Sequence, residues 1–265
     1  MPLVRRVQDV QLSGNGYRKN PDALKPARDL WSAPPSTAVK EFARLADSYE
    51  NLAASCTRGT VTYGPQGGSN AKKAIDASLN FELMASRISS ATEPELDLND
   101  LKTVRDWKMV RNRARQNWLL VDSNSESLCR EATKKAFKSL DQGEWEDAMK
   151  ILTDSLHGVG PATASAVLAL RDDSMPFMSE ESIRVSGVSG HPQPYSVAAY
   201  KVYHSMMNEK ATELSSTVDE KKNVTVTARD VERAIWAATY EQHYSDVAED
   251  RDEGENTSNK KRRIT

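Results

Sequence analysis

Residues 156–165, with the sequence LHGVGPATAS, combine residue types that can bind phosphate through the backbone. Gly158 and Gly160 permit a sharp turn and the close approach of an anion, and Pro161 fits the first turn of a helix. Backbone N–H groups at such a helix N-terminus have no partner within the helix and attract phosphate. A tightly packed helix–helix turn without a ligand would use the same residues. The residues that we expect to contact phosphate are Gly158, Val159, Gly160, Ala162 and Thr163.

Positive side chains recur at helical spacing within residues 100–121, upstream of the glycine turn. On a helix they project within a narrow sector, and a ridge of this kind can contact the phosphates of a nucleic-acid backbone. The alternative is a solvated helix face whose cations pair with nearby acids such as Asp106. The residues of this expected basic ridge are Arg105, Lys108, Arg111 and Arg115.

Residues 156–170, which we call the hairpin, closely resemble the hairpin of the helix-hairpin-helix DNA glycosylase superfamily. Trp107–Lys108 followed by Arg111, the GVGPATAS motif and the stretch that begins with Pro176–Phe177 resemble a group of uncharacterised, largely fungal proteins. The resemblance spans residues 81–240. It implies an all-α, helix-hairpin-helix, DNA-glycosylase-like fold and a partner in double-stranded DNA, contacted through its phosphate backbone. No established activity comes with it.

The glycosylase chemistry of that superfamily depends on two residues. An aspartate stabilises charge on the sugar as the flipped base leaves, and a hairpin lysine forms a Schiff base in bifunctional members. The position of the aspartate falls on Glu180 when it is counted from the hairpin, and on Ser179 when it is counted back from Arg184. The position of the lysine is Ala162. We therefore expect a non-catalytic protein. The alternatives are a monofunctional glycosylase that uses Glu180, and a short helix that Ser179 caps.

The composition narrows the possible partners. The formal net charge of the 265 residues is −2, so any nucleic-acid surface must be local. This near-neutral charge also favours a third hypothesis, a protein-interaction module that has lost DNA binding. Cys56, Cys129 and the four histidines show no metal-ligand spacing, and we expect no metal and no cofactor. No apolar run reaches the length of a membrane span, so we expect no membrane contact.

The sequence predicts three parts: a disordered segment at 1–35, an all-α domain at 36–245, and a disordered tail at 246–265. The tail is first acidic and then basic, and its basic end resembles a nuclear-import signal. We therefore expect a nuclear protein with DNA or nuclear proteins as partners. The four residues of the expected import signal are Lys260, Lys261, Arg262 and Arg263.

Apolar periodicity and capping patterns place the helices of the domain. Ser123 with Glu126, and Thr227 with Asp230, have the spacing of a capping box at a helix start. No convincing sheet is predicted. The expected helices cover residues 37–54, 71–89, 100–121, 124–140, 144–156 and 161–170, a short helix from about 179, then 195–214 and 228–244.

Overall fold

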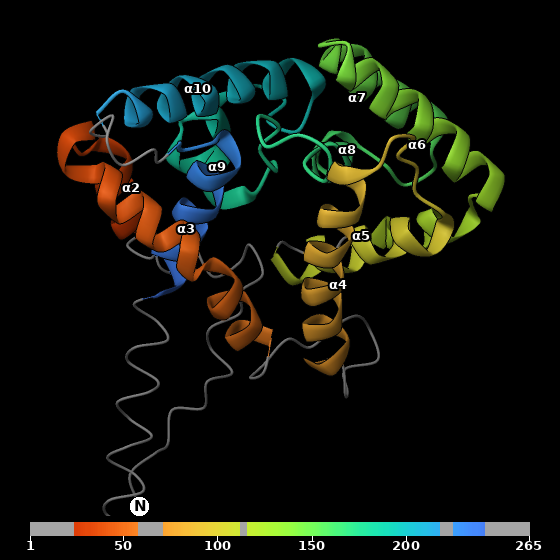
Figure 1. Cartoon of the computed structure of the whole chain (residues 1–265), viewed down its shortest axis with the longest axis horizontal. Coiled ribbons are helices and arrows are strands. Elements are labelled where there is room, and N and C mark those ends of the chain that lie inside the picture. The colour runs from red at the N-terminus through yellow and green to blue at the C-terminus, as the bar shows by residue number, and fades with distance from the viewer. Residues whose placement is uncertain (1–23, 58–70, 112–115, 218–224, 242–265) are drawn as a thin grey trace, which may run out of the picture.

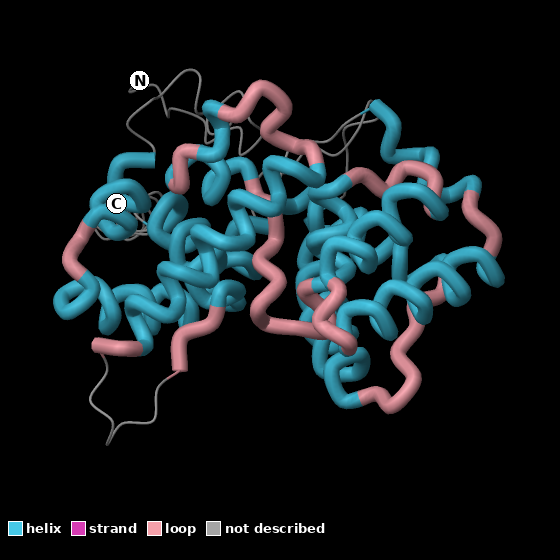
Figure 2. Tube along the Cα trace, turned by 90° about the horizontal axis from the view of Figure 1, so that it is seen from above, coloured by secondary structure: helices cyan, strands magenta, loops and turns pink. Residues whose placement is uncertain are grey.

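The computed structural model describes residues 24–57, 71–111, 116–217 and 225–241, and every regular element within these ranges is helical (Figure 1). This confirms the predicted all-α class. Figure 2, seen from above, shows helices joined by loops alone. The elements are α2 (Lys25–Ser32), α3 (Pro35–Thr57), α4 (Ala71–Ser90), α5 (Leu98–Arg111), η3 (Gln116–Ser123), α6 (Glu126–Asp141), α7 (Trp145–Ser155), α8 (Pro161–Leu168), α9 (Glu180–Val185), η4 (Val188–Gly190), α10 (Val197–Ser215) and a helix at 228–241.

The helices form two groups that lie side by side in Figure 1. One group contains α4 to α8, and the other contains α2, α3, α9, α10 and helix 228–241. Helix α8 lies in the middle of the first group, against α5, α6 and α7. Residues 163–168 of α8 are all buried, and most of them have small side chains. The neighbouring helices can therefore pack close to the backbone of α8.

The folded part begins earlier than the sequence predicts. The range 1–35, expected to be disordered, contains α2, and Leu24, Ala27 and Leu30 are buried against the core. Prolines in this range suggested a broken chain, but Pro26 occupies the first turn of α2, where its missing N–H costs little. Residues 1–23 and 242–265, including the expected import signal, lie outside the described residues.

The expected continuous helix over 100–121 is wrong. Helix α5 is described as far as Arg111, and residues 116–123 form the 3₁₀ helix η3. The described residues of the apolar arc that predicted this helix are all buried, so the arc indicated burial correctly and failed on the backbone geometry of residues 116–123. These residues are Leu101, Val104, Trp107 and Val121. Apolar spacing thus identifies buried side chains without distinguishing the α-helical turns of α5 from the 3₁₀ turns of η3.

Local capping patterns were a better guide. The Thr227–Asp230 box is confirmed, since Asp230 Oδ2 accepts from the Thr227 N–H at 2.9 Å and Thr227 Oγ1 accepts from the Asp230 N–H at 3.2 Å. The cap of α6 is displaced by two residues. Ser125 Oγ accepts from the Leu128 N–H at 3.2 Å, whereas the expected cap, Ser123, donates to the Leu120 carbonyl.

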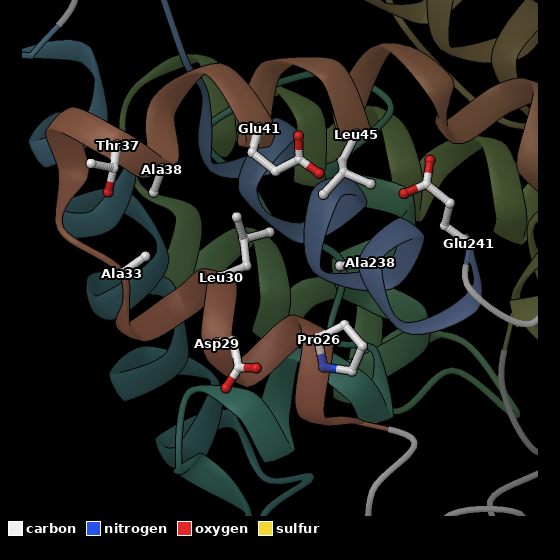
Figure 3. Close-up of a pocket in the computed structure, with 10 residues that line it drawn as sticks. All are labelled: Pro26, Asp29, Leu30, Ala33, Thr37, Ala38, Glu41, Leu45, Ala238 and Glu241. Atoms are coloured by element: carbon white, nitrogen blue, oxygen red, sulfur yellow. The ribbon is translucent and has the colours of Figure 1, made fainter.

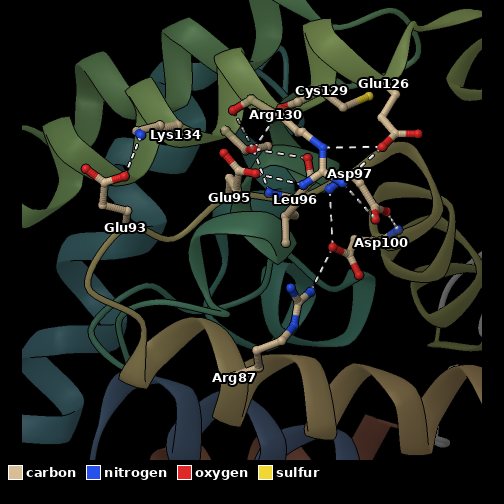
Figure 4. Close-up of polar contacts among 11 residues, drawn as sticks. Arg87, Glu93, Glu95, Leu96, Asp97, Asp100, Glu126, Cys129, Arg130 and Lys134 are labelled. Carbon is tan, nitrogen blue, oxygen red and sulfur yellow. Dashed lines mark hydrogen bonds and ion pairs between the residues drawn. The ribbon is translucent and has the colours of Figure 1, made fainter.

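A polar cluster ties the loop before α5 to α6 (Figure 4). Thr133 Oγ1 accepts from the buried Leu96 N–H at 2.8 Å, so the loop backbone is satisfied by a side chain of α6. Arg130, also on α6, donates to Glu95 at 2.7 Å and to Glu126 at 2.9 Å. These ion pairs are partly exposed and contribute little stability one by one, but together they hold the start of α5 in place.

The two groups of helices meet around Arg111, the last described residue of α5. Its side chain is 1% exposed, and Nη1 and Nη2 donate to the Glu232 carboxylate at 3.0 and 2.7 Å. Four aromatic rings surround the guanidinium, with centroids 4.9–5.2 Å from its central carbon, and this contact is favourable for a desolvated cation. These rings belong to Tyr49, Trp107, Phe177 and Trp236.

Arg111 therefore cannot belong to the basic ridge that the sequence predicts, and that assignment is wrong. Burial acts to lower the pKa of the guanidinium, but the attraction of Glu232 outweighs it, so the pKa lies above its ordinary value. Arg111 is a permanently charged part of the core. Helical spacing alone does not separate such a residue from the surface cations on the same helix.

We predict that replacing one partner of this ion pair destabilises the fold strongly. Arg111→Met leaves the Glu232 carboxylate buried without its cation, and the free energy of unfolding should fall by about 3–5 kcal/mol. The double variant Arg111→Met/Glu232→Met should recover part of this loss. Urea denaturation measures both, with Lys135→Met, in an exposed pair with Glu131, as the control. Equal losses in Arg111→Met and in the control would contradict the assignment.

His204 on α10 makes the stability of the fold depend on pH. Its ring stacks on Trp145 at 4.5 Å, and burial lowers its pKa below the ordinary value of 6.5. Below pH 6.5 the unfolded chain therefore binds a proton that the folded chain does not, and stability falls with decreasing pH until the folded pKa is reached. Urea denaturation at pH 7.5 and 5.5 should show a smaller loss in His204→Gln than in the wild type. Identical losses would remove His204 from this role.

Candidate nucleic-acid interface

The turn of the hairpin needs a glycine at position 158. Gly158 has a φ of +75°, in the left-handed region that side chains disfavour. A Cβ atom there would also lie 2.9 Å from the Val121 backbone nitrogen, at the end of η3. Val159, the next residue, is buried and anchors the turn in the core. The chain therefore passes close to η3 and then emerges at Gly160, which is exposed.

Asn124 holds the hairpin against η3 from the other side. Its Oδ1 accepts from the His157 N–H at 2.8 Å, and its Nδ2 donates to the carbonyls of His157 and Val121 at 2.9 and 3.0 Å. Asn124 is buried, so these hydrogen bonds are protected from water. The sequence gives no signal for Asn124, because nothing in the local pattern links it to a partner 33 positions away.

The N-terminus of α8 presents backbone amides to the surface. The Gly160 carbonyl accepts from the N–H groups of Thr163 and Ala164 at 2.8 and 2.9 Å, which closes the first helical turn. The N–H groups of Gly160 and Ala162 make no hydrogen bond within the described ranges. Pro161, between them, has no N–H. Two donors and the positive end of the helix dipole thus lie at one exposed point.

Lys108 of α5 contacts the first turn of α8. Its Nζ donates to Thr163 Oγ1, in the first turn of α8, at 2.7 Å, and its side chain is half-buried. The helix N-terminus already carries partial positive charge, so an ammonium group beside it raises the local positive potential. An anion that reached this point would be attracted by both. The sequence predicts each feature separately, but not that they meet across 55 positions.

The other members of the expected basic ridge do not extend this site. Arg105 donates to Asp106 and to Asp122 at 2.8 Å, and its side chain is 12% exposed. Arg105 therefore pairs with nearby acids, as the alternative predicts, but its side chain is largely buried and not on a solvated face. Arg115 lies outside the described residues, and Arg111 is in the core. Lys108 is the ridge residue that the structure brings to the hairpin.

Glu180 lies in the first turn of α9, as the capping alternative predicts. Ser179 Oγ accepts from the Ser182 N–H at 3.4 Å and caps the helix. The Glu180 carboxylate accepts from Nη2 and Nε of Arg184, one turn later, at 2.8 and 3.1 Å. Glu181, its neighbour, is buried and accepts from the Tyr240 hydroxyl at 2.6 Å. The Glu180 carboxylate is therefore engaged within its own helix, and Oε1 of Glu181 contacts helix 228–241.

Comparison with protein-family models, with curated proteins and with solved structures finds no match for this chain. Within the described ranges, no cluster of His, Cys, Asp and Glu side chains is suited to hold a metal ion. Among the described helices, none combines the length and apolar character needed to cross a bilayer. The function must therefore be argued from the chain's own geometry and from the sequence resemblance.

Replacing the hairpin glycine should cost more than replacing another left-handed glycine. Gly143 has a φ of +82° with no atom within 4 Å of an added Cβ, so Gly143→Ala should cost about 1–2 kcal/mol of backbone strain. Gly158→Ala adds the collision with η3 and should lose at least about 1 kcal/mol more. Urea denaturation of the two variants measures the difference. Equal losses would show that η3 yields to the added methyl group.

Proposed function

We propose that this protein is a non-catalytic, nuclear DNA-binding protein of helix-hairpin-helix, DNA-glycosylase-like type. It binds the phosphate backbone of double-stranded DNA at the N-terminus of α8. The observation that supports the proposal is that the Gly160 and Ala162 N–H groups lie at the start of α8, and that the Lys108 ammonium group donates to Thr163 in the same helical turn. Backbone amides and a lysine are a common combination for holding a phosphate oxygen.

The surroundings of the hairpin suit an extended polyanion better than a small enclosed ligand. Gly160 is exposed, so a long partner can pass over it. Leu119 and Leu120 are largely exposed beside the hairpin. The Cβ atom of Leu120 lies 3.1 Å from the position that a Cβ atom on Gly158 would occupy. Apolar side chains next to a phosphate site can contact the sugars of a nucleic acid, which a free phosphate ion lacks. The sequence resemblance supports DNA as the polyanion.

Two observations support a non-catalytic role. The glycosylase-like position that would carry the Schiff-base lysine is Ala162, which has no amine. Glu180, the candidate for the missing aspartate, holds Arg184 of its own helix in a two-point contact. Nuclear residence is proposed from the basic residues Lys260–Arg263 alone.

DNA binding should be weak, independent of base sequence and dependent on the hairpin. One to two phosphate contacts predict a shallow decrease of log affinity with log salt, with a slope of about −1 to −2. Gly160→Asp should weaken binding about tenfold or more, because it places a carboxylate among the amides. Lys108→Ala should reduce the salt slope by about 1. Fluorescence anisotropy with a labelled duplex at low and moderate salt measures all three.

The controls separate the site from general effects. At both Gly160 and Gly190 an added Cβ atom would meet open space, and neither residue has a positive φ. Gly190→Asp therefore matches Gly160→Asp in charge and in the risk to folding. Lys135→Ala, on the exposed face of α6, matches Lys108→Ala in charge. Circular dichroism confirms that each variant folds. Unaltered duplex binding by Gly160→Asp would refute the hairpin site, and no binding by the wild type would favour the protein-interaction hypothesis.

A further inference from the structure

A crevice lies between α2, α3 and the end of helix 228–241, far along the chain from the hairpin (Figure 3). Its floor is apolar, and its rim carries three carboxylates. In Figure 3 the side chain of Leu30 lies between α2 and α3, and Glu241 lies at the edge, where the described part of the chain ends. The floor contains Leu30, Ala38, Leu45 and Ala238, and the rim contains Asp29, Glu41 and Glu241.

The carboxylates of the acidic rim already form ion pairs with Arg44 and Lys25. Arg44 donates to Glu41 at 2.6 and 2.8 Å and to Glu241 at 2.7 Å, so one guanidinium connects two carboxylates. Lys25 pairs with Asp29 at 2.6 Å, and both side chains are more than 60% exposed. Exposed pairs of this kind exchange partners at little cost. A further guanidinium can therefore join the rim, and small apolar side chains can cover the floor.

We infer that this crevice is the docking site of residues 3–7 of the same chain, Leu-Val-Arg-Arg-Val. This segment pairs three apolar side chains with Arg5 and Arg6, which match the apolar floor and the acidic rim. It precedes α2, whose residues line the crevice, so docking is an intrachain event with a high effective concentration. Residues 8–24, 17 in number, separate the segment from α2, and a chain of this length can bridge about 20–25 Å, which is enough to fold back.

The basic end of the C-terminal tail is a poorer match. Lys260–Arg263 supplies four cations, but Ile264 is its one large apolar neighbour, and the tail before it is rich in Asp and Glu. Those acids would be brought close to the carboxylate rim and repelled by it. The N-terminal segment has Asp9 as its nearest acid. Charge and apolar pattern therefore both favour residues 3–7. This inference does not depend on DNA binding.

Site-specific photocrosslinking in the full-length chain tests the inference. Ala33 and Thr37 both line the crevice, and a benzophenone amino acid replaces one of them in each of two variants. With two variants, failure of one to fold does not decide the result. The control probe replaces Glu131 on the exposed face of α6. After irradiation at low micromolar concentration, mass spectrometry of the digested monomer and dimer bands identifies the captured peptide.

The expected product is a monomer in which the crevice probes capture residues 1–11 and the control probe does not. Arg5→Glu/Arg6→Glu should reduce the yield about fivefold or more, and replacing Lys260–Arg263 by serine should leave it unchanged. Capture of the C-terminal tail, crosslinking to a second copy, or a yield no higher than that of the control would each overturn the assignment of residues 3–7.

Discussion

A guanidinium taken out of water must meet a carboxylate, because the cost of burying each unpaired charge is several kcal/mol. In this protein the requirement falls on Arg111, which meets Glu232 across 121 positions of sequence. The pair joins the two groups of helices at their boundary, where the aromatic rings of α3, α5 and helix 228–241 surround it. Nearby, Glu82 of α4 pairs with Arg229 and Arg233 and crosses the same boundary. The relative placement of the two groups follows from satisfying these charges.

The same constraint fixes the rotation of α5 and therefore the direction of Lys108. Trp107, stacked on Phe81 at 3.7 Å, and Arg111 both point into the core, and Lys108 comes between them in sequence. With the core face of α5 set in this way, Lys108 is directed to Thr163 of α8. The small side chains of α8 allow α5 to pack close enough for this contact. The contact between Lys108 and the start of α8 is thus set by the packing of a buried face.

Local patterns predicted the parts of this structure that local physics determines. The Thr227–Asp230 cap, the Ser179 cap and the glycine turn of the hairpin each depend on residues a few positions apart, and all were placed correctly. The sequence could not separate buried Arg111 from the surface cations of the same helix, since its carboxylate partner is remote. Nor could it show that Lys108 reaches the hairpin. The 3₁₀ geometry of η3 was missed because its buried Val121 continues the apolar spacing of α5, and this spacing does not distinguish a 3₁₀ turn from an α-helical one.

The central claim is that the Gly160 and Ala162 amides, with Lys108, hold a phosphate of DNA. The most direct measurement is a titration of the ¹⁵N-labelled full-length protein with a short duplex, followed by backbone amide chemical shifts. The account predicts that the largest shifts fall on Gly160, Ala162 and Thr163, and that they shrink in Lys108→Ala. Shifts that cluster elsewhere on the surface, or amides at 158–163 that do not respond at saturating duplex, would contradict it.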